Sequence, residues 1–208
     1  MIDLYTFSTP NGRKVSIALE EMGLPYTVHS VDIHKDEQFE PDFLTISPNN
    51  KIPAIVDQET GISMMESGAI LQYLADKTGM FLPTEGPGRW RAIEWLTWQM
   101  GGFGPMLGQA HHFLHFKPGT SDYAEQRFGG EAKRLYGVLD KQLGKYGHVA
   151  GDYSIADMAI FPWAARWQWQ QIELTQFPNV LRWYRELADR PAVQRGYNLP
   201  AVAEIPMP

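Results

Sequence analysis

Three short segments of the chain combine side chains and backbone features that could bind an anionic ligand. The first is Thr9-Pro10-Asn11-Gly12, which follows an expected strand at Ile2–Phe7 and opens an expected helix. Ligands of open α/β sheets bind at the carboxyl ends of strands. A hydroxyl, an amide and helix N–H groups at this turn can donate hydrogen bonds to an anion. Because Thr, Pro, Asn and Gly are all turn formers, ordinary turn chemistry is the alternative.

The second segment is Asn49-Asn50-Lys51-Ile52-Pro53, which leads into another expected strand. Proline supplies no N–H to a β ladder, so the neighbouring Ile52 can keep its own N–H and C=O for a ligand. If the bond before Pro53 is cis, the turn aims both groups outward. An ordinary trans proline at a sheet edge is the alternative.

The third segment is Glu66-Ser67-Gly68, where an expected helix begins. A helix N-terminus carries unpaired N–H groups and partial positive charge, and therefore binds carboxylates. The hydroxyl of Ser67 adds a donor, and the Glu66 carboxylate can pair with an ammonium. An acid beside an anion site suits an amino-acid ligand, whereas simple capping of the helix is the alternative.

The elements around these segments predict an α/β layer in the first part of the chain. Strand-like runs flank an amphipathic helix that Gly23 ends, which gives a βαβ unit. A hairpin and a helix that begins at Glu66 follow. The expected order is therefore βαβ–ββα, an α/β fold. The expected strands are Ile2–Phe7, Tyr26–Ile33, Ile52–Val56 and Ile62–Met65.

The second part of the chain differs in composition. All seven tryptophans lie beyond residue 83, and the stretch 82–88 is rich in proline and glycine, as linkers are. Residues 1–83 hold 5 basic and 12 acidic side chains, against 13 and 12 in residues 84–208. We therefore predict two domains, 1–83 and 84–208, of which the second is all-helical. Its helices are expected to begin near Trp90, Asp122, Ser154 and Pro178, the third with a Ser154–Asp157 capping box.

The composition excludes several classes of protein. A chain of 208 residues without cysteine has no disulfide scaffold, no Cys-ligated metal and no thiol nucleophile of its own. The net charge of −6 argues against nucleic-acid binding, and no apolar run is long enough to span a membrane. Residues 1–8 lack the basic start of a signal peptide, so we expect a cytoplasmic protein.

Other chemistry-bearing residues have simpler explanations. His111 and His115 lie one helical turn apart in the run HHFLH, which includes His112, and could bind a metal. No carboxylate partner lies nearby, so packing or a substrate-pocket role is favoured. Asp157 is interpreted as a structural cap rather than a catalytic acid. Aromatic side chains around the helix kinked by Pro162 could line an electrophile pocket, although core packing is favoured: Trp163, Trp167 and Trp169.

The order of these segments resembles the glutathione transferases over essentially the whole chain. Ser47–Val56 followed by Glu66–Ile70 is similar to the glutathione-binding part of that superfamily. More narrowly, Thr9–Gly12, Gln38-Phe39 and Gly101–Gln109 resemble the bacterial nu class, whose members bind glutathione and reduce disulfides. The resemblance implies a thioredoxin-like N-terminal domain, an all-helical C-terminal domain and a homodimer.

The same resemblance implies how glutathione is held. The main chain of Ile52 would pair with the cysteinyl part of the ligand. Glu66 and Ser67 would hold the γ-glutamyl end. Gln38 and Lys51 would contact other polar groups.

The resemblance also suggests which residues act on the glutathione sulfur. Arg127 matches an arginine that this group supplies from the neighbouring subunit, although Arg134 lies nearby. A free thiol has a pKa of about 8.5. Lowering that pKa by about two requires roughly 2.7 kcal/mol of preferential stabilisation of the thiolate. Thr9 and Asn11, at a helix N-terminus, are the candidates for this role, with Ser8 as a competitor.

The implied activity is reduction of small disulfides by thiol–disulfide exchange, with reduced or oxidised glutathione as co-substrate and no metal. Reduction of organic peroxides is expected as a side activity. Two alternatives are conjugation of glutathione to electrophiles, and a non-catalytic homologue that only binds glutathione or other ligands.

Overall fold

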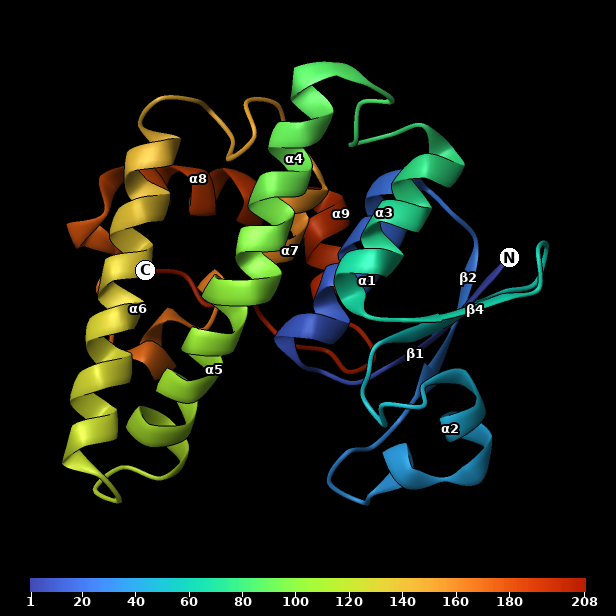
Figure 1. Ribbon diagram of the computed structural model, residues 1–208, viewed down its shortest axis with the longest axis horizontal. Helices are drawn as coiled ribbons and strands as arrows, with labels where there is room; N and C mark the ends of the chain where they lie inside the picture. The colour runs from blue at the N-terminus through green and yellow to red at the C-terminus, as the bar shows by residue number, and fades with distance from the viewer. The chain divides into compact units, whose positions relative to one another are not determined.

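The chain begins with a βαβ unit in the computed structural model, which describes residues 1–208. β1 (Ile2–Thr6) and β2 (Tyr26–Ser30) flank α1 (Pro10–Met22), and the two strands pair in parallel (Figure 1). Buried and half-buried residues alternate along β1, as expected for a strand with one face in the core. Gly23 ends α1 in the left-handed conformation at φ 62°, which glycine adopts without steric cost.

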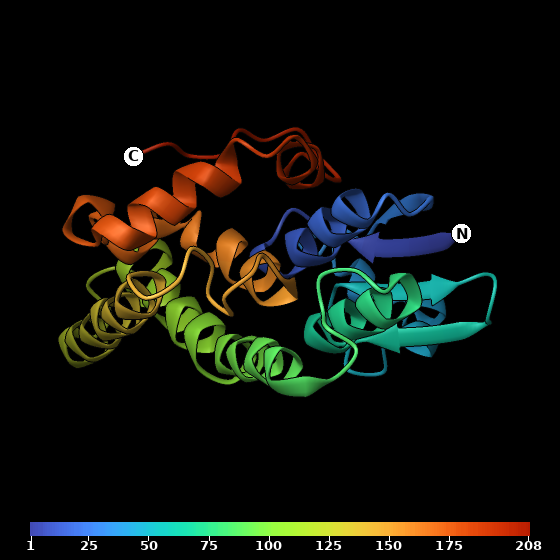
Figure 2. The same cartoon turned by 90° about the horizontal axis from the view of Figure 1, so that it is seen from above.

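The sheet has four strands in the order β2-β1-β3-β4. β3 (Ala54–Asp57) is antiparallel to β1 and to β4 (Ile62–Met65), and the turn of this hairpin lies at the right-hand edge of Figure 2. The helix α3 (Ser67–Thr78) then follows β4. This mixed sheet with its helices is a thioredoxin-like fold, so the predicted fold class of the first part is confirmed.

Two helical elements between β2 and β3 do not appear in the sequence prediction. A short 3-10 helix spans Glu37–Phe39, and α2 spans Pro41–Ile46. Phe43 of α2 is buried in a small cluster with Val31 and Ala54, against which Tyr5 also packs. A six-residue helix is too short to be stable alone, so this burial is what stabilises it.

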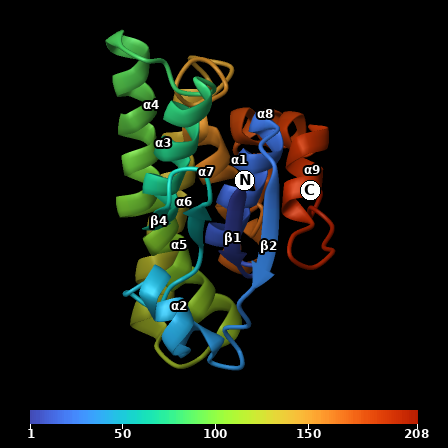
Figure 3. The same ribbon diagram turned by 90° about the vertical axis from the view of Figure 1, so that its right-hand side faces the viewer.

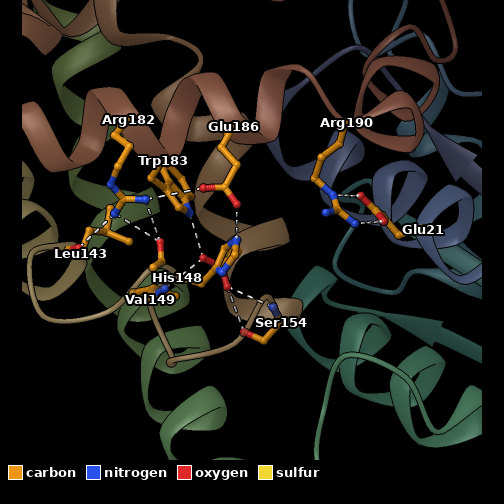
Figure 4. Close-up of polar contacts among 11 residues, drawn as sticks. Glu21, Leu143, His148, Val149, Ser154, Arg182, Trp183, Glu186 and Arg190 are labelled. Carbon is orange, nitrogen blue, oxygen red and sulfur yellow. Dashed lines mark hydrogen bonds and ion pairs between the residues drawn. The ribbon is translucent and has the colours of Figure 1, made fainter.

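A further helix, α9 (Pro191–Tyr197), lies beside α1 (Figure 3). The backbones touch at Gly196, where an added Cβ would lie 2.5 Å from Cα of Ile17, so only glycine fits. Arg190 forms a two-pronged ion pair with Glu21, with nitrogen–oxygen distances of 2.7 and 2.8 Å (Figure 4).

The chain divides into two compact units. The first comprises residues 1–82 and 189–205, and the second comprises residues 83–188 and 206–208. The predicted boundary at residue 83 assigns all of 84–208 to the second domain, whereas residues 189–205 belong to the first unit. The physical reason is the packing of α9 on α1, which joins segments almost 180 residues apart and leaves no local signal.

The second unit is helical, as predicted. α6 (Asp122–Leu143) begins at the predicted Asp122, and α8 (Pro178–Ala188) begins at the predicted Pro178. Two short π-helical stretches, Gln99–Phe103 and His112–Phe116, flank α5 (Gly104–His111). None of the helices has the length and apolar character that crossing a bilayer requires. The other main helices are α4 (Gly86–Trp98) and α7 (Ile155–Ala164).

The predicted capping box at the start of α7 is present. Asp157 is completely buried and accepts hydrogen bonds from the N–H of Ser154 at 3.1 Å and from the N–H of Val149 at 3.0 Å. It also accepts from Nε1 of Trp183 at 2.9 Å, so Val149, Ser154 and Trp183 converge (Figure 4). Asp157 therefore ties a loop and α8 to the start of α7, which is a structural role.

Candidate functional site

The register of the sheet brings the three predicted segments of the first unit to one edge. Tyr5 of β1 lies opposite Ala54, the first residue of β3, and Ala54 lies opposite Met65, the last residue of β4. The turn after β1, the loop before β3 and the start of α3 therefore meet there. We call this the convergent edge, and define it by Thr9–Gly12, Lys51–Pro53 and Glu66–Ser67.

The β1–α1 turn places Thr9 as the N-cap of α1. Its Oγ1 accepts a hydrogen bond from the N–H of Gly12 at 3.1 Å, and Pro10 occupies the first helical turn. A Cβ at Gly12 would come within 2.3 Å of the Phe7 carbonyl oxygen, so glycine lets α1 begin directly against the end of β1. The segment is thus both a turn after β1 and the N-terminus of α1, so the geometry alone does not separate turn chemistry from ligand binding.

The side chains of this turn differ in their surroundings. Asn11 is half-buried in the first turn of α1. The Oγ of Ser8 is buried without a hydrogen-bond partner in the chain, whereas the Thr9 hydroxyl is engaged by the helix. These surroundings distinguish the two hydroxyls, and the choice among Ser8, Thr9 and Asn11 stays a prediction.

The loop before β3 is organised by Ser47, a completely buried residue. Its hydroxyl donates to the carbonyl of Lys51 at 2.8 Å, and its carbonyl accepts from the N–H of Asn50 at 2.8 Å. Asn50 has a positive φ of 47°, which asparagine tolerates better than most residues. These contacts fix the chain immediately before Ile52.

The peptide bond between Ile52 and Pro53 is cis. Neither the N–H nor the C=O of Ile52 hydrogen-bonds to another backbone group, although the side chain packs against the Val31, Phe43 and Ala54 cluster. An extended peptide could pair with these two groups as it would with the edge of a sheet. The side chain of Lys51 is exposed beside them.

At the start of α3, Glu66 has a φ of 70° and ψ of 106°, a strained conformation for a residue with a side chain. Glu66 is the N-cap residue of α3 but its side chain makes no capping hydrogen bond, so of the capping alternative only the interaction of its charge with the helix dipole is left. The first intrahelical bond runs from the N–H of Ile70 to the carbonyl of Glu66 at 2.9 Å. The exposed carboxylate of Glu66 thus lies beside a helix N-terminus, which favours anions.

Beneath the start of α3 lies Lys14 of α1, which the sequence analysis did not identify. Lys14 is 1% exposed, and its Nζ donates to Oγ of Ser67 at 3.4 Å. Burial lowers the pKa of this ammonium to about 7, and the charge of Glu66 acts in the opposite direction. Lys14 stands one helical turn before the buried Ala18, and a lysine on the apolar stripe of a helix is the signal that could have revealed it.

Gln38 lies in the 3-10 helix after β2, apart from the three segments of the convergent edge. Because β2 runs parallel to β1, the chain leaves β2 on the side where β1 ends. The Nε2 of Gln38 donates to Asp36 at 3.4 Å, and its Oε1 is buried without a partner in the chain.

Arg127 lies on α6 in the second unit. It lines a cavity of about 280 Å³ with Met106, Phe128 and Glu131. Arg134 forms a two-pronged pair with Glu131, with distances of 2.7 and 2.8 Å. Of the two candidate arginines, Arg134 is therefore engaged within its own helix, whereas no hydrogen bond is seen for Arg127, whose charge also lowers the pKa of Glu131.

The histidines of the second unit pack against aromatic side chains. His111 is buried, hydrogen-bonds to Gln170 at 2.9 Å and stacks on Trp163 at a centroid distance of 5.4 Å. Burial lowers its pKa to about 4, and Arg166 contributes in the same direction. His115 stacks on Trp169 at 4.5 Å. No cluster of three or more potential metal-ligating side chains occurs in residues 1–208.

Comparisons with known proteins agree with this geometry. Residues 9–77 match the N-terminal domain and residues 103–191 match the C-terminal domain of the glutathione S-transferase family models. The chain is 50% identical to the disulfide-bond oxidoreductase YfcG of Escherichia coli, with 92% of each chain covered. It is 42% identical to YghU, a second disulfide-bond oxidoreductase of that organism, over 94% of this chain and 73% of that one.

Solved structures with bound ligands are also similar. A glutathione transferase from Pseudomonas putida with one glutathione disulfide bound per subunit superposes with a TM-score of 0.92 and 44% identity, covering 96% of this chain and 92% of that one. A family member from Pseudomonas fluorescens with two glutathione molecules bound has a TM-score of 0.90 and 45% identity, covering 96% and 93%.

Proposed function

Because the chain belongs to the glutathione S-transferase family, we propose that it reduces small disulfides with glutathione by thiol–disulfide exchange. The observation that carries the proposal is the convergent edge. There the backbone of Ile52, which makes no backbone hydrogen bond, and the N-terminus of α3 lie together in a chain that has no cysteine. The names of YfcG and YghU and the glutathione disulfide bound by the Pseudomonas putida structure support the choice of reaction.

Each end of glutathione has a complementary group at this edge. Ile52 pairs its N–H and C=O with the cysteinyl unit of the tripeptide. Ser67 and the N-terminus of α3 hold the γ-glutamyl carboxylate, and Glu66 pairs with the adjacent ammonium. Lys51 and Gln38 contact the remaining polar groups of the ligand. The first domain carries more acidic than basic residues, so binding depends on these local donors rather than on its net charge.

Thr9 and Asn11 stabilise the thiolate of glutathione. Both lie at the N-terminus of α1, whose partial positive charge favours an anionic sulfur. The hydroxyl of Thr9 accepts from Gly12, so its own hydrogen is left to be donated in another direction. Asn11 supplies a neutral amide donor and cannot itself act as a nucleophile.

The exchange proceeds in two balanced steps. The glutathione thiolate attacks one sulfur of the substrate disulfide, forms a mixed disulfide and releases the other sulfur as a thiolate. A second glutathione thiolate then attacks the glutathione sulfur of the mixed disulfide and releases the second substrate thiol. The products are two substrate thiols and one glutathione disulfide. A reducing compartment such as the cytoplasm supplies the reduced glutathione that this stoichiometry consumes.

We also propose that the protein acts as a homodimer in which Arg127 reaches the glutathione site of the neighbouring subunit. The support is the cavity around Arg127 and the engagement of Arg134 by Glu131. Arg127→Ala is expected to raise the KM for glutathione about tenfold, as loss of one charge-assisted contact does. Arg134→Ala is expected to leave that KM unchanged. The opposite pattern would reassign the role to Arg134.

Two assays test the proposed reaction against its alternatives. Reduction of hydroxyethyl disulfide, coupled to glutathione reductase and NADPH, is expected to be much faster than conjugation of a chloro-nitroarene. Faster conjugation would instead make the protein an electrophile-conjugating transferase. Retention on immobilised glutathione without turnover of either substrate would make it a binding homologue. Turnover of cumene hydroperoxide measures the expected peroxidase side activity.

A further inference from the structure

Lys14 is a buried cation in contact with the group that we assign to glutathione binding. Its ammonium lies 3.4 Å from Oγ of Ser67, and the two side chains are 1% and 4% exposed. Lysine is almost never buried to this degree without a specific partner, because removal of its charge from water is costly. Lys14 itself is too deeply buried to touch a ligand, and its contact with Ser67 is a route by which it can act on the start of α3.

The chemistry of this contact orients the Ser67 hydroxyl. An ammonium has three donors and no acceptor, so Ser67 can only accept from Lys14 while that group is protonated. The hydrogen of the hydroxyl must then point away from Lys14, where it can be donated to a carboxylate. A neutral amine has a lone pair, so a deprotonated Lys14 can accept that same hydrogen and withdraw it from a ligand.

We propose that Lys14 is a positioning residue for the γ-glutamyl carboxylate of glutathione, which it serves by holding the Ser67 hydroxyl as a donor. The inference rests on one part of the proposed function, namely that glutathione binds at the start of α3. It adds a residue that does not touch the ligand, and it makes binding sensitive to pH.

The charges around Lys14 give the direction of this pH dependence. Glu66 at the start of α3 favours the protonated form, whereas burial opposes it and brings the pKa to about 7. On α9, the other helix packed against α1, Arg195 is paired with Glu20 at 2.5 Å. On α1 itself, the guanidinium of Arg13 stacks on a tyrosine ring of α9 at 3.8 Å. Affinity for glutathione therefore falls as the pH rises through about 7.

The test is the dissociation constant of S-methylglutathione, measured by titration calorimetry at pH 6, 7 and 8. This ligand has no thiol, so thiol ionisation does not contribute. If only the form with protonated Lys14 binds tightly, the dissociation constant of the unchanged protein rises about tenfold from pH 6 to pH 8. Titration of the ligand's amine affects all variants equally. A difference between variants in how steeply the dissociation constant changes with pH therefore measures the contribution of Lys14.

Three variants separate this role from a structural one. Lys14→Met is expected to bind about tenfold more weakly at pH 6 and to lose the pH dependence. Its kcat at saturating glutathione is expected to be retained. Ser67→Ala is expected to lose the same pH dependence although Lys14 is present. Lys145→Met removes one exposed charge from the second unit and is expected to match the unchanged protein.

Several outcomes would overturn the proposal. One is a pH dependence that survives in Lys14→Met. Another is a pH dependence that survives in Ser67→Ala, and this result counts even if Lys14→Met fails to fold. If the unchanged protein binds S-methylglutathione with no dependence on pH, the inference fails while the proposed function stands. If it does not bind S-methylglutathione at any pH, the proposed function itself fails.

Discussion

Two regions of the molecule, the surroundings of Asp157 in the second unit and the convergent edge of the first, differ in how their polar groups are satisfied within the chain. In the second unit, Asp157 is completely buried and its carboxylate accepts from two backbone N–H groups and the Trp183 indole. In the first unit, the Ile52 backbone makes no backbone hydrogen bond, and Glu66 holds a strained φ without capping its helix. A buried polar group with all its partners inside the chain stabilises the fold, whereas the groups at the convergent edge are those that we propose to bind glutathione.

Removal of the Asp157 carboxylate is expected to cause the largest loss of stability among these variants. Asp157→Ala leaves the buried Val149 N–H and Trp183 N–H without partners, and each such loss costs about 1–3 kcal/mol. We expect the free energy of unfolding to fall by at least about 3 kcal/mol, measured by urea denaturation. Asp152→Ala, an exposed acid in the preceding loop, is the matched control and should change that free energy by less than about 0.5 kcal/mol. A similar small change in Asp157→Ala would refute the structural role.

The thiolate site should show the reverse pattern, with a loss of activity and little loss of stability. Asn11→Ala removes one donor to the glutathione sulfur, and a hydrogen bond to a charged group is worth about 1.5–3 kcal/mol. We expect kcat/KM for hydroxyethyl disulfide to fall roughly 10- to 100-fold. The free energy of unfolding is expected to fall by much less than in Asp157→Ala, because Asn11 is only half-buried.

Thr9 is expected to affect both stability and activity, because it caps α1 and is also a proposed donor to the glutathione sulfur. Thr9→Ala should therefore lose activity and also about 1 kcal/mol of stability through the missing cap. Thr9→Ser keeps the hydroxyl and should retain both. A loss of stability without a loss of activity would leave Thr9 with only the capping role.

Lys14 combines features of both regions. It is buried like Asp157, but it belongs to the first unit, to which we assign glutathione binding. Its ammonium has a pKa of about 7 in the folded chain against an ordinary value of 10.5. Between these pH values the unfolded chain binds more protons, so the contribution of Lys14 to the free energy of unfolding becomes more favourable as the pH rises. The maximum slope is about 1.4 kcal/mol per pH unit.

Urea denaturation of the unchanged protein and of Lys14→Met at pH 6, 7.5 and 9 measures this contribution. The stability of the unchanged protein relative to the variant is expected to increase by about 2.7 kcal/mol across that range. Parallel stability curves for the two proteins would mean that Lys14 does not change its protonation there.

Local patterns predicted most of the fold. The βαβ unit, the β3–β4 hairpin and the Ser154–Asp157 box follow from neighbouring residues, and the structure has all three. α2 and α9 were missed because helices of six and seven residues depend on tertiary packing. The return of α9 to the first unit depends on the close approach at Gly196, which no local pattern reveals.

The candidate site shows the same division between local and tertiary information. The three segments of the convergent edge were predicted from turn and helix-start chemistry. Ser47 and Lys14 were missed because a buried hydroxyl and a buried ammonium acquire their partners only in the folded chain. The roles of Thr9, Asn11, Gln38, Lys51, Glu66 and Arg127 remain predictions that a bound ligand would test.

A crystal structure with glutathione disulfide bound tests the central claim most directly. We predict that one sulfur lies within hydrogen-bond distance of Thr9 or Asn11, that Ile52 pairs with the cysteinyl backbone, and that a γ-glutamyl carboxylate contacts Ser67. A disulfide sulfur distant from both Thr9 and Asn11 would contradict the account, even if the tripeptide were bound in the same unit.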